Sequence, residues 1–190
     1  MKVSLGKVHG NKLDFAIDGT IAEFANMIRR YGMAEVPVFA IDNIVIYENS
    51  TVMFDEYLAH RLGQIPLVTP AKSTGDLEVT LVLDEVGPKM VYSSDLKSSD
   101  KDVKSARDKI PIVTLGEGQK LRLEAKAKLA NGKTSSKYQS GLVSYGIDGD
   151  KFSFKVESFY QMGPNDIVVR ACDRIVEDLS ELKKGIKKAK

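Results

Sequence analysis

Regular alternation of hydrophobic and polar residues marks two parts of the chain. Leu13, Phe15 and Ile17 alternate with polar residues, so residues 2–18 are predicted to form two strands joined by a turn. Residues 119–130 alternate over the longest stretch, with charged residues between the apolar ones. A period of two is that of a strand with one buried face, so this segment is predicted to be the most regular strand of the fold.

A first helix is predicted from hydrophobic residues that follow one another three and four positions apart. These residues are Ile21, Phe24, Ala25 and Ile28. Thr20 and Glu23 have the spacing of a capping box, which predicts that the helix begins at Thr20. Gly32 is predicted to end the helix in a left-handed conformation.

The segments after this helix alternate between strand, helix and loop. Residues 37–47 are apolar at nearly every central position, which is typical of a strand covered on both faces. Asp55 is a favourable N-cap for a short helix that Gly63 would end. Residues 77–93 are predicted to form a hairpin, and the polar segment 94–109 a solvated loop.

The region after residue 109 is predicted to be mainly strands. Short strands are expected at 110–115, 142–145 and 151–158. Asn131-Gly132 is a strong signal for a hairpin turn. The Gly132-Lys133-Thr134 sequence resembles the end of a phosphate-binding loop but lacks its first glycine, so a turn is the better interpretation.

The last predicted element is a long helix from Pro164 to Lys187, with Arg170, Arg174 and acidic residues largely off its apolar line. Its hydrophobic residues recur at helical spacing, namely Ile167, Val168, Ala171, Ile175, Leu179, Leu182 and Ile186. Such a helix is about 36 Å long, whereas a domain of this size has a radius of gyration of about 16 Å. The apolar stripe therefore suggests a partner surface, with a long internal core helix as the equal alternative.

Composition limits the protein class but names no chemistry. A chain of 190 residues with 43% hydrophobic residues can form one domain or two small ones. No apolar run is long enough to span a membrane, no secretory signal is expected, and the single Cys172 fits a reducing, cytoplasmic compartment. The net charge of +2 comes from a lysine-rich C-terminal tail, which either complements the helix dipole or forms a phosphate-binding arm.

Candidate chemical groups are few. Glu56 and His60 lie one helical turn apart and suggest an acid/base pair or a metal site, but His9 is the only other histidine. A local ion pair or a contact with another subunit is the preferred interpretation, and no catalytic or metal-binding residue is predicted. Cys172 is predicted to be a small buried residue rather than a nucleophile.

One long run of sequence resembles a known family. Its matching residues are Ala25, Asn26, Arg29, Arg30, Glu35, Val36, Pro37, Ala40, Ile41, Asp42, Asp55, Glu56, Ala59, His60, Arg61, Leu62, Gly63, Ile65, Pro66 and Leu67. This pattern resembles the D subunit of archaeal DNA-directed RNA polymerase, a relative of the bacterial alpha subunit. Val156-Glu157-Ser158 and the helix after it extend the resemblance over nearly the whole chain. A middle block departs from it, because residues 135–140 lack the His, Ala, Trp and Pro of the family pattern.

The resemblance implies an α+β fold with a discontinuous, alpha-like dimerisation domain (residues 1–47 and 147–190) and an inserted, mostly-β domain (residues 48–146). It implies a non-catalytic assembly subunit that pairs with subunit L and forms a platform for subunits N and P and the large catalytic subunits. DNA would be contacted only through the holo-complex. The residues expected to bind partners are Ile21, Phe24, Ile28, Arg29, Arg30, His60, Arg61, Ile175, Leu179 and Leu182.

A second departure concerns cofactors. Many family members carry an inserted iron–sulfur module before the Val-Glu-Ser strand, whereas only a few residues separate Tyr145 from Phe152 here. Such a cluster needs several cysteine ligands, and the chain has one. No cluster, zinc or other cofactor is therefore expected. Two other classes stay open: an alpha-like scaffold that forms homodimers, and a small metal-dependent enzyme built on Glu56 and His60.

Overall fold

The computed structural model describes residues 1–188, so Lys190 of the basic tail lies outside the described residues. Helices and antiparallel sheets confirm the predicted α+β class. In chain order the elements are β1 (Lys2–His9), β2 (Lys12–Asp18), α1 (Ala22–Ala34), β3 (Val38–Asn49), α2 (Asp55–Gly63), β4 (Glu78–Val86), β5 (Lys89–Tyr92), β6 (Lys97–Ser98), β7 (Pro111–Leu115), β8 (Lys120–Ala130), β9 (Gly141–Asp148), β10 (Lys151–Ser158) and α3 (Pro164–Lys188). They form two compact units: unit 1 (Met1–Val36 and Asn131–Lys190) and unit 2 (Pro37–Ala130).

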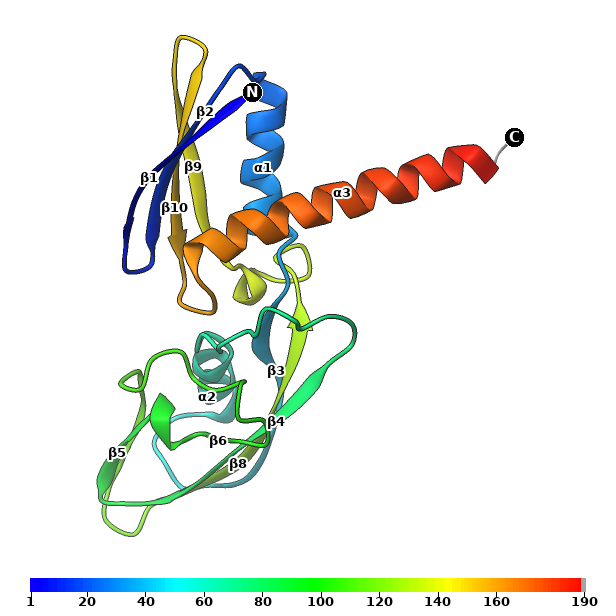
Figure 1. Cartoon of the computed structure of the whole chain (residues 1–190). Coiled ribbons are helices and arrows are strands. Elements are labelled where there is room, and N and C mark those ends of the chain that lie inside the picture. Colours follow the sequence, from blue (N-terminus) through cyan, green and yellow to red (C-terminus); the bar gives the residue numbers. More distant parts are fainter. Residues whose placement is uncertain (189–190) are drawn as a thin grey trace. The chain divides into compact units, whose positions relative to one another are not determined.

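Unit 1 is an antiparallel sheet with the strand order β1-β2-β10-β9, and α1 and α3 pack on one of its faces (Figure 1). Alternate residues of β2 and β10 point toward the helices and form the core. At its centre the rings of Phe15 and Phe154 are paired across the two strands and stack with their centroids 4.6 Å apart. The buried part of α3 adds Ile167, Ala171 and Ile175 to this core.

Unit 2 is built on the antiparallel sheet β3-β8-β4-β6 and a separate β5-β7 pair. The predicted alternation in β8 is confirmed, because its apolar residues from Leu121 to Ala127 are buried while Arg122 and Lys120 are exposed. Helix α2 packs against β3 and β7 with Leu58 and Leu62 in the core. Unit 2 therefore has a hydrophobic core of its own.

The compact units divide at other residues than the domain limits expected from the sequence. The resemblance implied limits between residues 47 and 48 and between residues 146 and 147, whereas the chain changes unit after Val36 and after Ala130. The reason is strand pairing, since β3 pairs with β8 along its length and β9 pairs with β10 as far as Asp148.

Both predicted ends of α1 are wrong. The helix begins at Ala22, and Ile21 is the N-cap with an extended backbone and no side-chain cap hydrogen bond. The Thr20–Glu23 capping box therefore does not form, because Thr20 precedes the N-cap. Gly32 lies inside the helix, where a Cβ atom would come within 2.9 Å of Val143 Cγ2. Gly32 therefore does not end the helix; its lack of a side chain allows α1 to pack closely against β9.

Two predicted hairpins are also wrong. Residues 77–93 contain β4 and β5 with a turn between them, but β4 pairs with β8 and β6 whereas β5 pairs with β7. Asn131-Gly132 lies between β8 and β9, which belong to different sheets. The polar segment 94–109 is more anchored than a solvated loop, because Leu96 and Val103 are buried in the core of unit 2.

Candidate partner-binding surfaces

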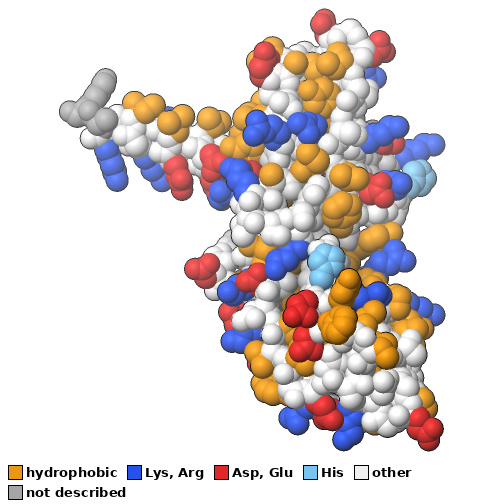
Figure 2. All heavy atoms as spheres, turned by 180° about the vertical axis from the view of Figure 1, so that it is seen from behind, with side chains coloured by type: hydrophobic (Ala, Val, Ile, Leu, Met, Phe, Trp, Pro, Cys, Tyr) orange, Lys and Arg blue, Asp and Glu red, His pale blue; other side chains and the backbone are white. Residues whose placement is uncertain are grey.

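Helix α3 is buried in its first half and exposed in its second. Ile167 and Ala171 are fully buried in unit 1, and Ile175 is 6% exposed. From Val176 onward the apolar residues are solvent-exposed. These residues, called the distal stripe, are Val176, Leu179, Leu182 and Ile186. Figure 2 shows hydrophobic side chains along one side of this extended part of the helix and charged side chains along the opposite side.

An apolar groove of about 340 Å³ lies where α3 meets the sheet of unit 1. Its walls include Val3 and Leu5 from β1, Phe24 from α1, and Val169 and Cys172 from α3. Strand β1 is an edge strand with every residue exposed, and Leu5 is 81% exposed. An open groove with so few polar atoms is suited to apolar side chains of a partner.

The groove and the distal stripe form one continuous face of α3. Val169, Cys172, Val176 and Leu179 follow each other at intervals of three and four residues, which places them on the same side of the helix. This side runs next to the buried line of Ile167, Ala171 and Ile175 rather than coinciding with it. A partner helix that lies along α3 could therefore contact both regions at once.

The structure separates the residues that were expected to form the L-binding surface. Ile28 and Ile175 are 4% and 6% exposed, so they belong to the core of unit 1 and offer little surface to a partner. Ile21, Leu179 and Leu182 are each more than half exposed. Phe24 is partly buried and lines the groove. Ile28 and Ile175 therefore support the surface from within the core, whereas the other residues are accessible to a partner.

Arg29 and Arg30 lie inside α1 and have different surroundings. Arg29 donates hydrogen bonds from Nε and from one terminal nitrogen to Asn26 Oδ1, at 3.1 and 2.9 Å. Arg30 is exposed and lines a separate groove of about 330 Å³ together with Glu23 and Lys133. Within residues 1–188, Arg30 makes no side-chain hydrogen bond or ion pair, which leaves its guanidinium accessible to a partner.

Tyr31 connects α1 to the middle of α3. Its hydroxyl donates a 2.8 Å hydrogen bond to Asp178 Oδ2, and Arg174 donates to the other oxygen of the same carboxylate. The hydrogen bond to Asp178 raises the pKa of Tyr31, with partial burial as the second cause. Among residues 1–188, no side chain of α3 beyond Asp178 hydrogen-bonds or ion-pairs with another element. This contact therefore marks where the packing of α3 against the rest of unit 1 ends.

His60 and Arg61 lie in the last turn of α2, in unit 2. Arg61 donates a hydrogen bond to the carbonyl oxygen of Pro111 at 2.6 Å, so part of its guanidinium is already bound within unit 2. His60 is exposed, and no ion pair joins it to Glu56 in the described part of the chain. Glu56 and His60 thus do not form the expected local pair, and both side chains are accessible from solvent.

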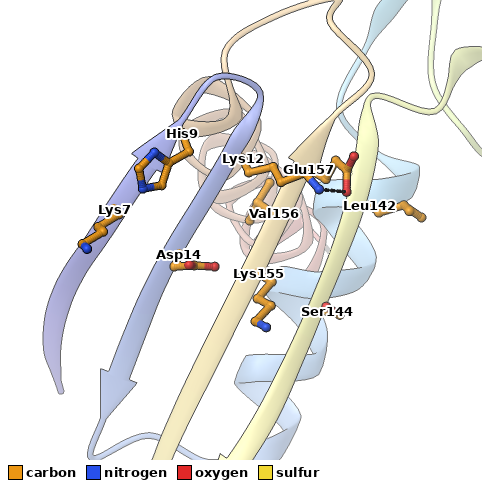
Figure 3. A pocket seen from close by; sticks show the side chains of 9 residues that line it. All are labelled: Lys7, His9, Lys12, Asp14, Leu142, Ser144, Lys155, Val156 and Glu157. Carbon is orange, nitrogen blue, oxygen red and sulfur yellow. Dashed lines mark ion pairs between the residues drawn. The ribbon is translucent and has the colours of Figure 1, made fainter.

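The outer face of the unit 1 sheet holds a shallow hollow of about 400 Å³ lined by charged side chains of both signs (Figure 3). Its charged and titratable residues are Lys7, His9, Lys12, Asp14, Lys155 and Glu157. Lys12 Nζ and Glu157 Oε2 are 3.3 Å apart in an exposed ion pair. Exposed pairs of this kind contribute about 0–1 kcal/mol to stability. We therefore interpret this face as an ordinary solvent-exposed surface.

Few groups in the described chain suggest chemistry. Among residues 1–188, no group of three or more His, Cys, Asp or Glu side chains is arranged to hold a metal ion. Cys172 was predicted to be buried, but it is exposed on the groove face of α3. Desolvation by its neighbours raises the pKa of the Cys172 thiol, which disfavours the reactive thiolate. Within the same residues, no helix is both long and apolar enough to cross a membrane.

The sequence interpretation missed some of the exposed apolar residues of the groove and the distal stripe. Val3 and Leu5 were assigned only to a strand, although as part of an edge strand they line the groove. Val169 and Val176 were left out because they do not belong to the line through Ile167 and Ile175. The signal that reveals them is a second line at three- and four-residue spacing through Cys172 and Leu179.

A match to a protein-family model defines the class of protein to which the chain belongs. Residues 43–147, more than half of the chain, match the family model described as the RNA polymerase Rpb3/RpoA insert domain. The class is thus that of RNA polymerase chains with an Rpb3/RpoA insert domain. The matched region includes most of β3 and all of the elements from α2 to β8.

Individual relatives narrow the class to one family. DNA-directed RNA polymerase subunit Rpo3 of Thermococcus kodakarensis is 48% identical over 142 residues, which cover 71% of this chain and 55% of the relative. The subunit of the same name from Pyrococcus furiosus is 47% identical over 142 residues, covering 71% and 54%. That from Methanocaldococcus jannaschii is 42% identical over 163 residues, covering 85% and 83%.

The chain belongs to the Rpo3 family of DNA-directed RNA polymerase subunits. The resemblance to the archaeal alpha-like subunit that the sequence suggested is thereby confirmed. The chain spans about half the length of the Thermococcus and Pyrococcus relatives and most of the Methanocaldococcus one.

Proposed function

We propose that this chain is a non-catalytic assembly subunit of DNA-directed RNA polymerase that pairs with subunit L through unit 1. The observation that carries the proposal is the continuous apolar face of α3, which runs from the groove to the distal stripe. Leu179 and Leu182 are 56% and 59% exposed. Full burial of an exposed leucine contributes about 1.5–3 kcal/mol, so covering each of these contributes about half of that. A partner that covers this face removes a large apolar surface from water.

The exposed members of the expected surface would make the contact. Ile21 precedes α1, Phe24 lines the groove, and Leu179 and Leu182 lie on α3. Ile28 and Ile175 would support them from the core of unit 1. Together these residues support a pairing mode in which helices of the partner lie against α1 and α3.

The heterodimer would then act as the platform that recruits subunits N and P and the large catalytic subunits. Arg30, His60 and Arg61 are exposed and are the residues proposed to contact them, with Arg29 positioned by Asn26. Nucleotide transfer would take place on the large subunits, and DNA would be reached only through the assembled enzyme in the cytoplasm. The absence of a cofactor on this chain stays a prediction.

Replacement of both Leu179 and Leu182 by Glu tests the pairing surface. Two carboxylates buried without partners cost several kcal/mol, so coelution with subunit L of the same organism should be lost. Leu142→Glu is the control, because Leu142 is also about half exposed but lies on β9. That control should still coelute, and all variants should keep the wild-type circular dichroism spectrum. Stoichiometric coelution of a folded double variant would contradict the proposal.

One observation favours a second candidate, a homodimer of this chain. Acidic residues predominate in segment 173–181 of α3, whereas segment 183–188 contains four lysines. Two antiparallel copies of α3 would therefore place opposite charges against each other. Light scattering of the isolated chain separates the candidates, because a stable dimer without subunit L supports self-pairing and a monomer supports pairing with L.

A further inference from the structure

The corner between β3 and α2 in unit 2 exposes three large apolar side chains. Val52 is 85% exposed, Phe54 72% and Tyr57 66%. The ring centroids of Phe54 and Tyr57 are 6.4 Å apart, so the two rings form one surface. We call Val52, Phe54 and Tyr57 the aromatic corner. Contiguous exposed apolar side chains of this size are typical of binding sites, whereas isolated ones are not.

The backbone that presents the aromatic corner is fixed by hydrogen bonds. Asn49 donates from Nδ2 to the carbonyl oxygen of Met53 at 2.9 Å and to Asp55 Oδ1 at 2.7 Å. Thr51 donates from its amide and its hydroxyl to Asn49 Oδ1, and its hydroxyl accepts from the amide of Met53. Since the segment is already ordered, binding at the corner carries little conformational entropy cost.

The core of unit 2 anchors both ends of this segment. Met53 packs against the core from the loop side, and Leu58 and Leu62 of α2 are fully buried. Phe54 and Tyr57 lie between these anchors in sequence but face solvent. Their exposure therefore comes from a well-packed scaffold that turns the rings outward, rather than from a loose end.

Carboxylates lie beside the rings. Asp55 and Glu56 form the first turn of α2, where the helix dipole stabilises their charged form. Within residues 1–188, the Glu56 carboxylate makes no side-chain hydrogen bond or ion pair. Figure 2 shows acidic side chains next to hydrophobic ones and a histidine on unit 2. The corner thus combines aromatic faces with an available negative charge.

We propose that the aromatic corner, with Asp55 and Glu56, binds a segment of another protein chain that carries an arginine next to an apolar side chain. A guanidinium can stack on an aromatic ring while it donates hydrogen bonds to a carboxylate, and the apolar neighbour covers Val52. The carboxylates disfavour a nucleic acid or an anionic membrane as occupant. This docking site lies on unit 2 and does not involve α3.

Overlapping short peptides that tile subunits N and P and the large subunits of the same organism are the probe. Their choice rests on the proposed function. Peptides that contain an arginine beside an apolar residue should bind the wild-type chain. Phe54→Ala and Tyr57→Ala should each weaken this binding about tenfold or more, as for aromatic residues at the centre of an interface. Glu56→Arg should abolish it, and exchange of the peptide arginine for glutamate should restore binding to that variant.

Two matched controls lie elsewhere on unit 2. Val86→Ala removes an exposed apolar side chain of β4, and Glu117→Arg reverses a charge in the β7–β8 turn. Both should bind the peptides like the wild type. The proposal is overturned if no peptide binds, or if the corner variants bind as well as the controls. The Leu179/Leu182 double variant keeps the two proposals apart, because it should lose subunit L and retain the peptides.

Discussion

Ile167 and Ile186 belong to the same helix and the same predicted apolar stripe, yet the first is fully buried and the second is 61% exposed. In the first half of α3, the sheet of unit 1 and helix α1 cover the line of Ile167, Ala171 and Ile175. In the second half the helix continues with a similar pattern but without a covering element among residues 1–188. The same helical spacing thus places apolar residues in the core of unit 1 in the first half of α3 and on the solvent-exposed surface in the second.

The difference shows what stabilises each half. The first half gains its helical structure from tertiary packing, which is the usual source of helix stability in proteins. The second half depends on helix propensity and on charged neighbours such as Arg174 and Glu177, which form an ion pair. A partner that covers the distal stripe would supply the packing that the chain itself does not.

The largest expected effect compares two isoleucines on α3. Ile167→Ala should lower the free energy of unfolding by about 2–5 kcal/mol, because it leaves a cavity in the core of unit 1. Ile186→Ala should change it by about 0.5 kcal/mol or less in the isolated chain, because the side chain is already exposed. Urea denaturation measures both values. Equal losses would mean that the isolated chain already covers its distal stripe, for example in a homodimer.

The next effect tests the contact that divides the two halves. Tyr31→Phe should lower the free energy of unfolding by about 0.5–1.5 kcal/mol near pH 7, because the hydrogen bond to Asp178 is lost. The pKa of Tyr31 is raised from 10.0 in the folded chain, so its neutral form is the one that stabilises the fold. This contribution is complete below pH 10 and is lost as the pH rises through the higher, folded-state pKa.

Denaturation at neutral and at strongly alkaline pH measures the Tyr31 effect. The wild type and Tyr31→Phe should differ at neutral pH and converge at alkaline pH. Tyr47→Phe is the matched control, because the Tyr47 hydroxyl donates a 3.3 Å hydrogen bond to Glu124 that is exposed to solvent. It should change stability by about 0.5 kcal/mol or less. A Tyr31 effect that persists unchanged at high pH would point to ring packing instead of the hydrogen bond.

The sequence predicted the elements of α3 and β8 well because their patterns are local. Helical spacing and strict alternation depend only on neighbouring residues, and both segments follow them over many positions. It also predicted the two strands within residues 2–18, which pair as β1 and β2, but it was wrong where a strand pairs with one that is not its neighbour in the sequence. The 77–93 hairpin failed because β4 and β5 each pair with a strand far away in the sequence. Local pattern gives the strand but not its partner.

The candidate surface could be predicted in part for the same reason. Ile175 and Leu179 are one turn apart in the same predicted apolar stripe, and nothing in their spacing shows that the first is buried and the second exposed. That difference depends on where the sheet and α1 end. The aromatic corner was missed because Phe54 and Tyr57 resemble ordinary helix-start residues until the fold turns their rings outward.

The smallest expected effect concerns the helix backbone itself. A Cβ atom on Gly185 would meet no other atom within 4 Å, unlike one on Gly32, which would crowd Val143. Gly185→Ala should therefore stabilise the second half of α3 by about 0.5–1 kcal/mol through helix propensity alone. Amide hydrogen exchange around Leu182 should slow several-fold while the global free energy of unfolding stays unchanged. A matching rise in global stability would mean that the second half folds as one unit with the core, which would remove the distinction between the two halves of α3.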